Sequence, residues 1–260
     1  MKTFLAALAL AACLCAQDTT PAYTSAGIVN GANFASGPVA PNTAVSLFGT
    51  NLSWSETAMG WEDITNNEMP KKLGGVQVFV AGYPAHLYYV SPTQVNLLIP
   101  SFLRPGVVEI WLVREGTLGP VVQITLQDAA PALFQTPDGL PIATHLDGSL
   151  VTKDSPASAG ETIILWATGL GCIENQAPGD DGTLPAGAQF VCQRDQFSVW
   201  IGGAQLTMGG HGVDYAGVAP GYAGLYQVNV RMPDRFPANP ELQIAVGDSF
   251  SPAALILPAK

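Results

Sequence analysis

The chain has 260 residues, a length that suits two ordinary domains or one large one. Only 12% of the residues are charged while 28 are glycine and 21 proline, which is typical of an all-β protein with many turns and excludes long amphipathic helices. The formal net charge of −10, with no basic cluster to offset it, repels nucleic acid and anionic membranes, so we expect no nucleic-acid partner.

The chain begins with a charged start and an apolar stretch at 3–12, which is typical of a secretory signal and too short to span a bilayer comfortably. Two processing sites fit this region. Cleavage after Ala16 would define a signal peptide of residues 1–16, whereas a lipobox pattern would place a lipid on Cys13. No second apolar run is long enough for a transmembrane segment. We expect an exported protein, secreted or associated with the cell envelope, in the periplasm or outside the cell.

Residues 17–26 are polar, and we expect a flexible or extended tether there. The first domain is expected over 27–130 and the second over 131–260, with the boundary at a proline-containing turn. Short strands separated by Gly, Pro, Asn and Asp turns, in units of about 100 residues, indicate two tandem immunoglobulin-like β-sandwiches. The expected strands are 45–52, 76–80, 86–90, 94–99, 107–113, 121–126, 162–167, 197–201, 225–230, 241–246 and 254–257.

A Gln-Val-Asn sequence occurs twice, at 94–96 and 227–229, and each copy is followed by an apolar strand end and a proline, Pro100 or Pro233. Apolar residues at alternate positions predict one buried face, with Gln and Asn on the other. Other segments repeat in the same order along the chain, which indicates a divergent tandem duplication. We interpret the repeated sequence as a framework strand whose polar side chains contact neighbouring loops or solvent.

Both halves contain a long loop at the same place, 53–75 and 171–196. Long loops inside compact domains are often functional. The first holds Trp54 and Trp61 among acidic residues, and exposed aromatic rings of this kind can stack on sugars or protein partners. The alternative is that the two rings fold back as a lid on the sandwich. Trp54 and Trp61 are the candidate binding residues.

The second long loop contains Cys172 and Cys192. Two cysteines in an exported chain most simply form a disulfide, which would stabilise the fold by about 3 kcal/mol through loop closure. A metal site is disfavoured because there is no CxxC pair and no nearby histidine. Asp180 and Asp181 could help to hold calcium, but further acidic residues at alternating positions are missing, so a solvated loop is favoured.

No constellation of residues indicates catalysis, a metal or a cofactor, so we expect no enzyme. The three histidines are far apart and are interpreted as ordinary surface or packing residues: His86, His145 and His211. Residues 247–250 (Gly-Asp-Ser-Phe) are similar to an esterase nucleophile block, but no histidine follows them, and a hairpin turn is favoured. Three tryptophans lie within expected strands and are expected in the core: Trp111, Trp166 and Trp200.

Several motifs resemble the TIG family of immunoglobulin-like domains, namely the glycine-bounded hairpin at 74–82 and the Tyr-Val-Ser-Pro-Thr-Gln sequence at 89–94. The paired arrangement, with the motifs at 167–171 and 215–230, resembles the uncharacterised C-terminal domain of exported acidobacterial (Solibacter-type) proteins. The resemblance covers nearly all of the mature chain. It implies a pair of β-sandwiches, and it supplies no established catalytic residues.

The sequence therefore predicts a non-enzymatic exported binding or structural module. The leading hypothesis is adhesion-type recognition of a glycan or protein through the long loops. One alternative is an architectural envelope spacer without a ligand, and another is a secreted hydrolase, which would need a cleft with converging acid and base residues.

Overall fold

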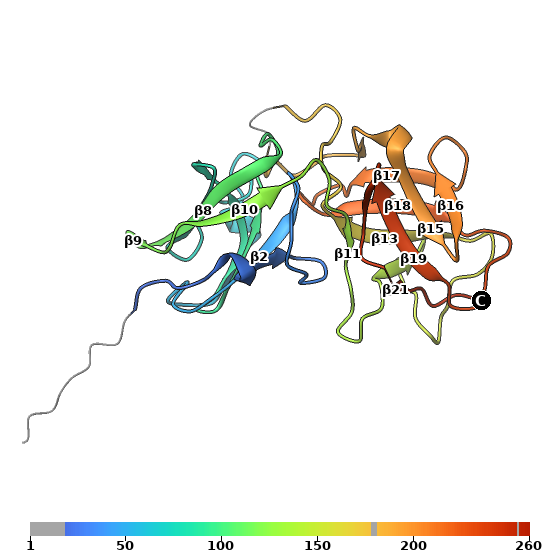
Figure 1. Ribbon diagram of the computed structural model, residues 1–260, viewed down its shortest axis with the longest axis horizontal. Coiled ribbons are helices and arrows are strands. Elements are labelled where there is room, and N and C mark those ends of the chain that lie inside the picture. Colours follow the sequence, from blue (N-terminus) through green and yellow to red (C-terminus); the bar gives the residue numbers. More distant parts are fainter. Residues whose placement is uncertain (1–18, 178–180, 254) are drawn as a thin grey trace, which may run out of the picture.

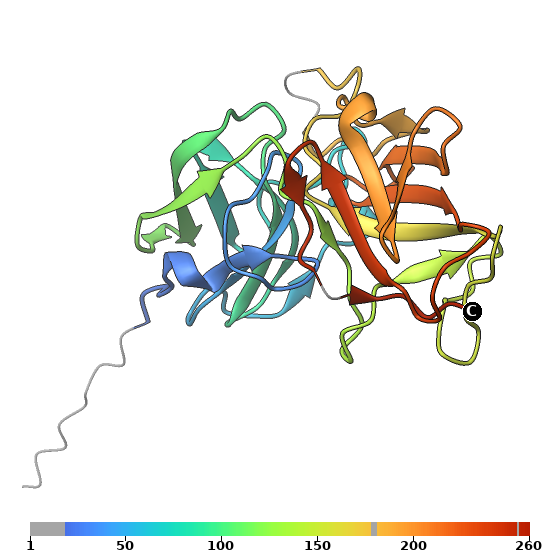
Figure 2. The same ribbon diagram turned by 45° about the vertical axis from the view of Figure 1, so that its right-hand side comes forward.

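The computed structural model describes residues 19–177, 181–253 and 255–260, and it shows two β-rich units that lie side by side in both views (Figures 1 and 2). The predicted signal peptide 1–16, the possible lipidation site Cys13 and Asp180 lie outside these residues. Within the described ranges, no helix is long and apolar enough to cross a membrane.

The described chain is all-β, with short 3₁₀ turns as its only helical elements, and all pairings between its named strands are antiparallel. The strands of the N-terminal unit are β1 (Ile28–Asn30), β2 (Ala44–Phe48), β3 (Thr57–Ala58), β4 (Val76–Val80), β5 (Tyr83–Pro84), β6 (His86–Val90), β7 (Gln94–Leu98), β8 (Gly106–Arg114), β9 (Thr117–Leu118) and β10 (Val122–Leu126). Those of the C-terminal unit are β11 (Ala132–Leu133), β12 (Ala143–His145), β13 (Thr162–Thr168), β14 (Gln189–Phe190), β15 (Phe197–Ile201), β16 (Ala204–Thr207), β17 (Val213–Val218), β18 (Tyr226–Arg231), β19 (Glu241–Val246), β20 (Ser249–Phe250) and β21 (Leu255–Ile256). The 3₁₀ turns are η1 (Ser25–Gly27), η2 (Trp61–Asp63) and η3 (Arg194–Gln196).

The two units pair their strands in the same order. Sheet 1 has the order β1-β2-β7-β6-β3 and sheet 2 the order β10-β8-β4-β5, while sheet 3 runs β11-β13-β18-β17-β14 and sheet 4 runs β16-β15-β19-β20. In this scheme β2, β7 and β6 correspond to β13, β18 and β17, and β4 and β8 correspond to β15 and β19. The strand order thus agrees with the duplication that the sequence indicates.

Each unit has its own hydrophobic core, because alternate side chains of each strand point to opposite faces of the sheet. The N-terminal core is built from inward residues that include Val45, Leu47, Val78, Val95, Leu97, Ile110 and Leu112. The C-terminal core includes Ile163, Leu165, Phe197, Val199, Tyr226, Val228 and Ile244. Four strands begin and end where the sequence predicts them: β4, β6, β15 and β19.

The expectation that three tryptophans lie in the core is wrong. Each of them sits between two core residues of its strand and therefore points to the outer face, where it is half-buried: Trp111, Trp166 and Trp200. Trp111 stacks on Phe79 with ring centroids 5.5 Å apart, and Trp200 lies 6.3 Å from the Phe250 ring. Aromatic neighbours on the same sheet therefore cover Trp111 and Trp200 in place of the core.

The segment expected to be a tether is docked on the N-terminal unit within its described part, from residue 19 onward. The amide of Ala22 donates to Thr50 O at 2.9 Å, and Tyr23 is buried in the N-terminal core. The Tyr23 hydroxyl donates to Pro120 O at 2.6 Å and accepts from the amide of Leu112 at 2.7 Å. Its burial raises the pKa of this phenol to about 12. The segment is extended, and it is part of the fold.

The two long loops meet at the junction of the units. The amide of Met69 donates to Gly182 O at 3.0 Å, and the amide of Leu184 donates to Asn67 O at 2.9 Å. The Asn67 side-chain amide also donates to Leu184 O at 2.8 Å. The predicted disulfide is confirmed, since Cys172 and Cys192 are bonded with a Cα–Cα distance of 5.5 Å, and it closes the base of the second loop. The two loops are therefore hydrogen-bonded to each other across the junction, and we call this loop pair the strap.

Candidate functional site

The outer face of sheet 1 carries the candidate site. Along β7, Val95 and Leu97 point into the core, so Gln94, Asn96 and Leu98 point outward. The C-terminal unit covers the Leu98 end of this face, where Leu98 packs with residues of both units. The Gln94 end is left open. The boundary between the covered and open parts is a cavity of about 490 Å³, which we call the inter-unit groove.

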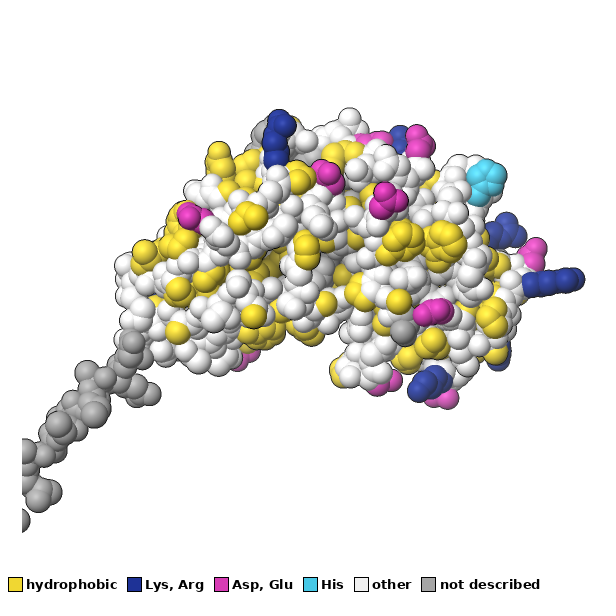
Figure 3. Space-filling model, in the orientation of Figure 1, with side chains coloured by type: hydrophobic (Ala, Val, Ile, Leu, Met, Phe, Trp, Pro, Cys, Tyr) yellow, Lys and Arg dark blue, Asp and Glu magenta, His cyan; other side chains and the backbone are white. Residues whose placement is uncertain are grey.

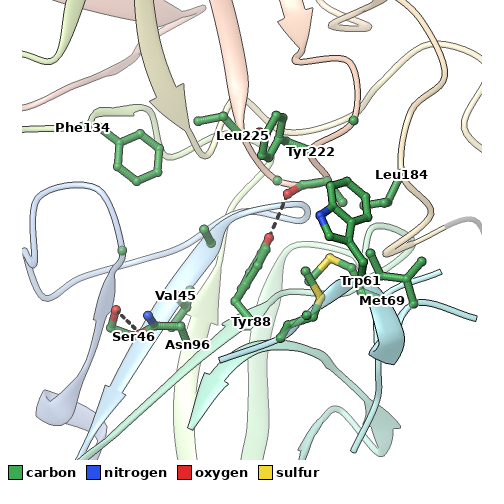
Figure 4. Close-up of a pocket in the computed structure, with 18 residues that line it drawn as sticks. Val45, Ser46, Trp61, Met69, Tyr88, Asn96, Phe134, Leu184, Tyr222 and Leu225 are labelled. Atoms are coloured by element: carbon green, nitrogen blue, oxygen red, sulfur yellow. Dashed lines mark hydrogen bonds between the residues drawn. The ribbon is translucent and has the colours of Figure 1, made fainter. Parts of the chain in front are cut away.

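Aromatic and sulfur-containing side chains form one end of the groove. Met59, Trp61 and Met69 come from the first long loop, Leu184 from the second, and Tyr222 from the turn between β17 and β18. Figure 4 shows Trp61, Met69 and Leu184 grouped on one side of Tyr88. Trp61 and Tyr222 remain 80% and 63% exposed, so both rings are free to contact a ligand at the mouth.

Local backbone contacts hold the two exposed rings in place. The amide of Gly60 donates to the Asp63 carboxylate at 2.8 Å, which fixes the short turn η2 that begins at Trp61. The amide of Gly221 donates to Pro185 O at 2.7 Å and thereby ties the Tyr222 turn to the second long loop. Each ring therefore stands on a hydrogen-bonded turn.

The other end of the groove is polar. The Ser46 hydroxyl and the Gln94 side-chain amide both donate to Asn96 Oδ1, at 2.9 and 2.8 Å. The Asn96 carbonyl oxygen thus has its partners inside sheet 1, and its Nδ2 has no protein partner among the residues that the structure describes. Ser46 and Asn96 lie on the far side of Tyr88 from Trp61 (Figure 4). An amide donor therefore faces the groove at this end.

Hydrogen bonds hold the two units together beside the groove. The Tyr88 hydroxyl donates to Ala223 O at 2.9 Å across the junction, and its burial raises the pKa of this phenol. The Thr168 hydroxyl donates to Gly224 O at 2.8 Å and accepts from the Ala44 amide at 2.9 Å. The Tyr88–Ala223 and Ala44–Thr168 bonds join the C-terminal unit to sheet 1, and the Thr168–Gly224 bond orients Thr168 for this contact. The groove is a preformed site, as small-molecule sites usually are.

The two tryptophans proposed from the sequence lie in different surroundings. Trp61 lines the groove. Trp54 stands apart from it, with the Arg114 guanidinium 3.7 Å from its ring centroid and its indole nitrogen donating to Glu115 at 2.9 Å. Arg114 is itself buried and donates to Asn51 O and to Thr19 O. Trp54 therefore stacks on the guanidinium of buried Arg114, and its side chain remains 56% exposed.

A cluster of ionisable side chains lies beside the groove at the junction. His86 is fully buried; its Nε2 is 2.9 Å from Glu68 Oε1, and its Nδ1 is 3.6 Å from Asp181 Oδ2. Burial lowers the pKa of His86, and the hydrogen bond to Glu68 opposes this. Lys71 hydrogen-bonds to Glu68 and, together with His86, lowers the pKa of that carboxyl. We call these four residues the junction cluster.

The groove lacks the groups that acid–base or metal chemistry would need. None of its lining residues is Asp, Glu, His, Cys, Lys or Arg. In the described part of the chain, no group of three or more His, Cys, Asp or Glu residues is placed to hold a metal ion. Asp181 of the calcium hypothesis is buried against His86. Ser249 begins β20, directly after the turn that follows β19, as the hairpin interpretation predicts.

Sequence reasoning missed most of the groove. It identified Trp61 and the two long loops, but not Tyr222, Met59 or the polar end at Ser46 and Asn96. One signal could have found the covered end of this face, next to the groove. The apolar run Leu97-Leu98-Ile99 has no polar alternation, which is typical of a strand covered on both faces.

No family model and no curated protein matches the sequence. Among solved structures, the chain is similar to a surface glycan-binding protein of Bacteroides ovatus in complex with a mixed-linkage heptasaccharide, with 11% identity, a TM-score of 0.34, and coverage of 86% of this chain and 43% of that one. A surface glycan-binding protein of Prevotella bryantii gives 12% identity, a TM-score of 0.26, and coverage of 90% and 41%. The Escherichia coli adhesin FdeC gives 13% identity, a TM-score of 0.23, and coverage of 92% and 65%.

The chain spans less than half the length of the two glycan-binding proteins. At these identities and TM-scores, neither the ligands nor the roles of these proteins transfer to it. What the groove can bind therefore has to be inferred from the residues that line it.

Proposed function

We propose that the protein is a non-enzymatic binding module, built from two tandem immunoglobulin-like sandwiches related to the TIG and acidobacterial exported domains. The inter-unit groove is the observation that carries this proposal. It is preformed, it is lined from both units and both long loops, and it presents Trp61 and Tyr222 at its mouth. Because no acid or base converges on it, a binding role is favoured over a hydrolase.

We further propose that the module works in the cell envelope or outside the cell. The bond between Cys172 and Cys192 supports an oxidising compartment. Cleavage after Ala16 and lipidation of Cys13 remain the two routes, and the intact mass of the mature protein distinguishes them because only the second adds acyl chains.

The partner classes are a glycan or a protein, and the test compares the two loop tryptophans. Purified protein is screened against glycans and envelope proteins, and each hit is measured again with Trp61→Ala and Trp54→Ala. We expect Trp61→Ala to weaken binding about tenfold or more, since a buried aromatic contact contributes about 1.5 kcal/mol or more. Trp54→Ala, the matched control, leaves the affinity unchanged. Binding that survives Trp61→Ala intact would place the site elsewhere.

The second candidate is an architectural spacer, and the strap of paired loops favours it. The bonds from Met69 to Gly182 and from Leu184 to Asn67 would hold two rigid units at a fixed angle. A spacer predicts that the same screen yields no ligand at all, whichever tryptophan is present.

A further inference from the structure

The residues that line the groove restrict the kind of ligand that it can bind. The inference drawn from them rests on the proposed binding function. We propose that its ligand is an uncharged small molecule with an apolar body and one hydrogen-bond acceptor. The body lies between Trp61, Met69 and Tyr222, and the acceptor receives a hydrogen bond from Asn96 Nδ2. Of the two partner classes named above, this inference removes the glycan as a ligand of the groove, because each of the many hydroxyl groups of a glycan needs a polar partner.

Charge is the first argument. The protein carries a net charge of −10, yet none of the residues lining the groove is charged. On the face shown in Figure 3, the charged side chains are scattered and the hydrophobic ones are interspersed with uncharged surface. A charged ligand would lose its hydration on entering the groove and would meet no opposite charge there. The site therefore selects against ions of either sign.

The apolar end provides the second argument. Met59, Met69, Ile64 and Leu184 form its wall, and all of them belong to the paired loops. Methionine side chains are flexible and polarisable, so they adapt to apolar bodies of irregular shape. A volume of about 490 Å³ is within the range of sites that enclose small organic molecules. A sugar ring placed there would leave most of its hydroxyls without partners.

The polar end provides the third argument. Two donors, from Ser46 and Gln94, already occupy Asn96 Oδ1, so the unsatisfied part of this side chain is its Nδ2 donor. The Tyr88 hydroxyl is directed to Ala223 O and is therefore committed to the junction. Asn96 Nδ2 is thus the side-chain donor available at this end. A carbonyl or ether oxygen is the group that it would bind.

The duplicated strand supplies a matched control. Gln227 Nε2 donates to Asn229 Oδ1 at 2.8 Å, as Gln94 does to Asn96, but Asn229 does not line the groove. Changing either asparagine to aspartate keeps an oxygen that accepts from the neighbouring glutamine and removes the Nδ2 donor. Any effect specific to Asn96→Asp therefore reports the groove and not the strand.

The test uses Prodan, an uncharged naphthalene dye with one carbonyl oxygen, whose emission depends on polarity and on hydrogen bonding to that oxygen. We expect the full-length protein to bind Prodan, and Asn96→Asp to weaken binding about tenfold and shift the emission to shorter wavelength as the hydrogen bond is lost. Asn229→Asp changes neither. Trp61→Ala weakens binding at least as much, and Ala44→Phe, which puts a large ring in place of a small lining side chain, abolishes it.

Any other outcome overturns the inference. Three comparisons of ligands distinguish its failure from the failure of the proposed binding function. If anilinonaphthalene sulfonate, an anionic dye of similar size, binds the groove as tightly as Prodan, the selection against charge is wrong. If neutral oligosaccharides bind in a Trp61-dependent manner and Prodan does not, the binding function stands and the ligand class proposed here falls. If Prodan, every oligosaccharide and every envelope protein of the screen fail to bind, both proposals fail and the spacer remains.

Discussion

The two copies of the Gln-Val-Asn strand differ in what covers their outer face. In β7 and β18 the glutamine donates to the asparagine at the same distance, 2.8 Å. The next outward residue is Leu98 in β7, which is fully buried, and Arg231 in β18, which is exposed. The same framework strand is covered by the other unit in one copy and not in the other.

This difference explains where the candidate site arises. Each unit fills its core with its own side chains, and the groove is lined by residues of both units. When the C-terminal unit packs on sheet 1, the contact ends part of the way along β7, between Leu98 and Asn96. The site lies at that edge. A function that neither copy has alone can therefore come from the packing of one copy on the other.

The largest expected effect comes from exchanging the residues that distinguish the two strands. Leu98→Arg places an unpaired charge among Met69, Leu184 and Ala223, and we expect it to lower the free energy of unfolding by roughly 3–5 kcal/mol. Arg231→Leu, the reverse exchange on an exposed position, changes it by less than about 0.5 kcal/mol. Urea denaturation followed by circular dichroism measures both. Equal effects of the two changes would mean that the junction does not distinguish the copies.

The second comparison is between the two long loops, of which only the second has a disulfide. Reduction removes the constraint that the Cys172–Cys192 bond places on the unfolded chain, so we expect a loss of about 3 kcal/mol for a sequence separation of 20. The loop of the N-terminal unit, residues 53–75, contains no cysteine and therefore no such bond. Urea denaturation with and without a thiol reductant measures the loss, and the double variant Cys172→Ser/Cys192→Ser serves as the thiol-insensitive control. No change on reduction would contradict this role of the bond.

Much of the scaffold could be predicted from the sequence, because strand periodicity is a local signal. β4, β6, β15 and β19 begin and end where the sequence predicts them. β17 was missed because its Gly217 and the following Ala-Pro-Gly sequence are typical of a turn, while the structure pairs it with β18 through an irregular register near Tyr215. The cysteine pair was predictable because it depends only on compartment and composition.

The groove could not be predicted, because it depends on how the units pack. Alternation shows that Trp111 lies in a strand, but it does not tell which face of that strand is covered. Asn96 and Asn229 have the same local sequence, and only the position of the C-terminal unit makes one of them a groove residue. Trp54 and Trp61 likewise share a loop and differ in what lies beneath them, a buried guanidinium or an open cavity.

A smaller loss of stability is expected from a substitution at Gly224, where the two units pack against each other. A Cβ there would lie 2.5 Å from Leu98 Cδ1 and 2.5 Å from the Tyr88 hydroxyl, so we expect Gly224→Ala to cost about 2–3 kcal/mol, in part through its φ of +73°. Gly221 has a φ of +81° and open space around its Cβ, so Gly221→Ala should cost only the backbone strain, about 1 kcal/mol. Thermal unfolding measures the difference. Equal losses would show that strain alone decides both.

The smallest expected effects concern two histidines, His86 at the junction and His145 in the C-terminal unit. Their contributions to the free energy of unfolding depend on pH with opposite signs. The pKa of His86 is lowered from 6.5 by burial, so the unfolded chain binds more protons than the folded one below that value. Its contribution to stability is complete above pH 6.5 and is lost as the pH falls from there through the folded pKa. The lowered pKa of Glu68, which lies below 4.5 in the fold, adds a loss in the same direction at lower pH.

His145 behaves in the opposite way, because its hydrogen bond to Glu161 raises its pKa above 6.5. Its contribution is complete below pH 6.5 and is lost as the pH rises through the folded pKa; it is small because the pair is partly exposed to solvent. Melting temperatures between pH 4.5 and 8 measure both residues. We expect His86→Gln to flatten the acid side of the curve and His145→Gln only the alkaline side. A His86→Gln protein that remains as acid-sensitive as the wild type would exclude the junction cluster as the source of that sensitivity.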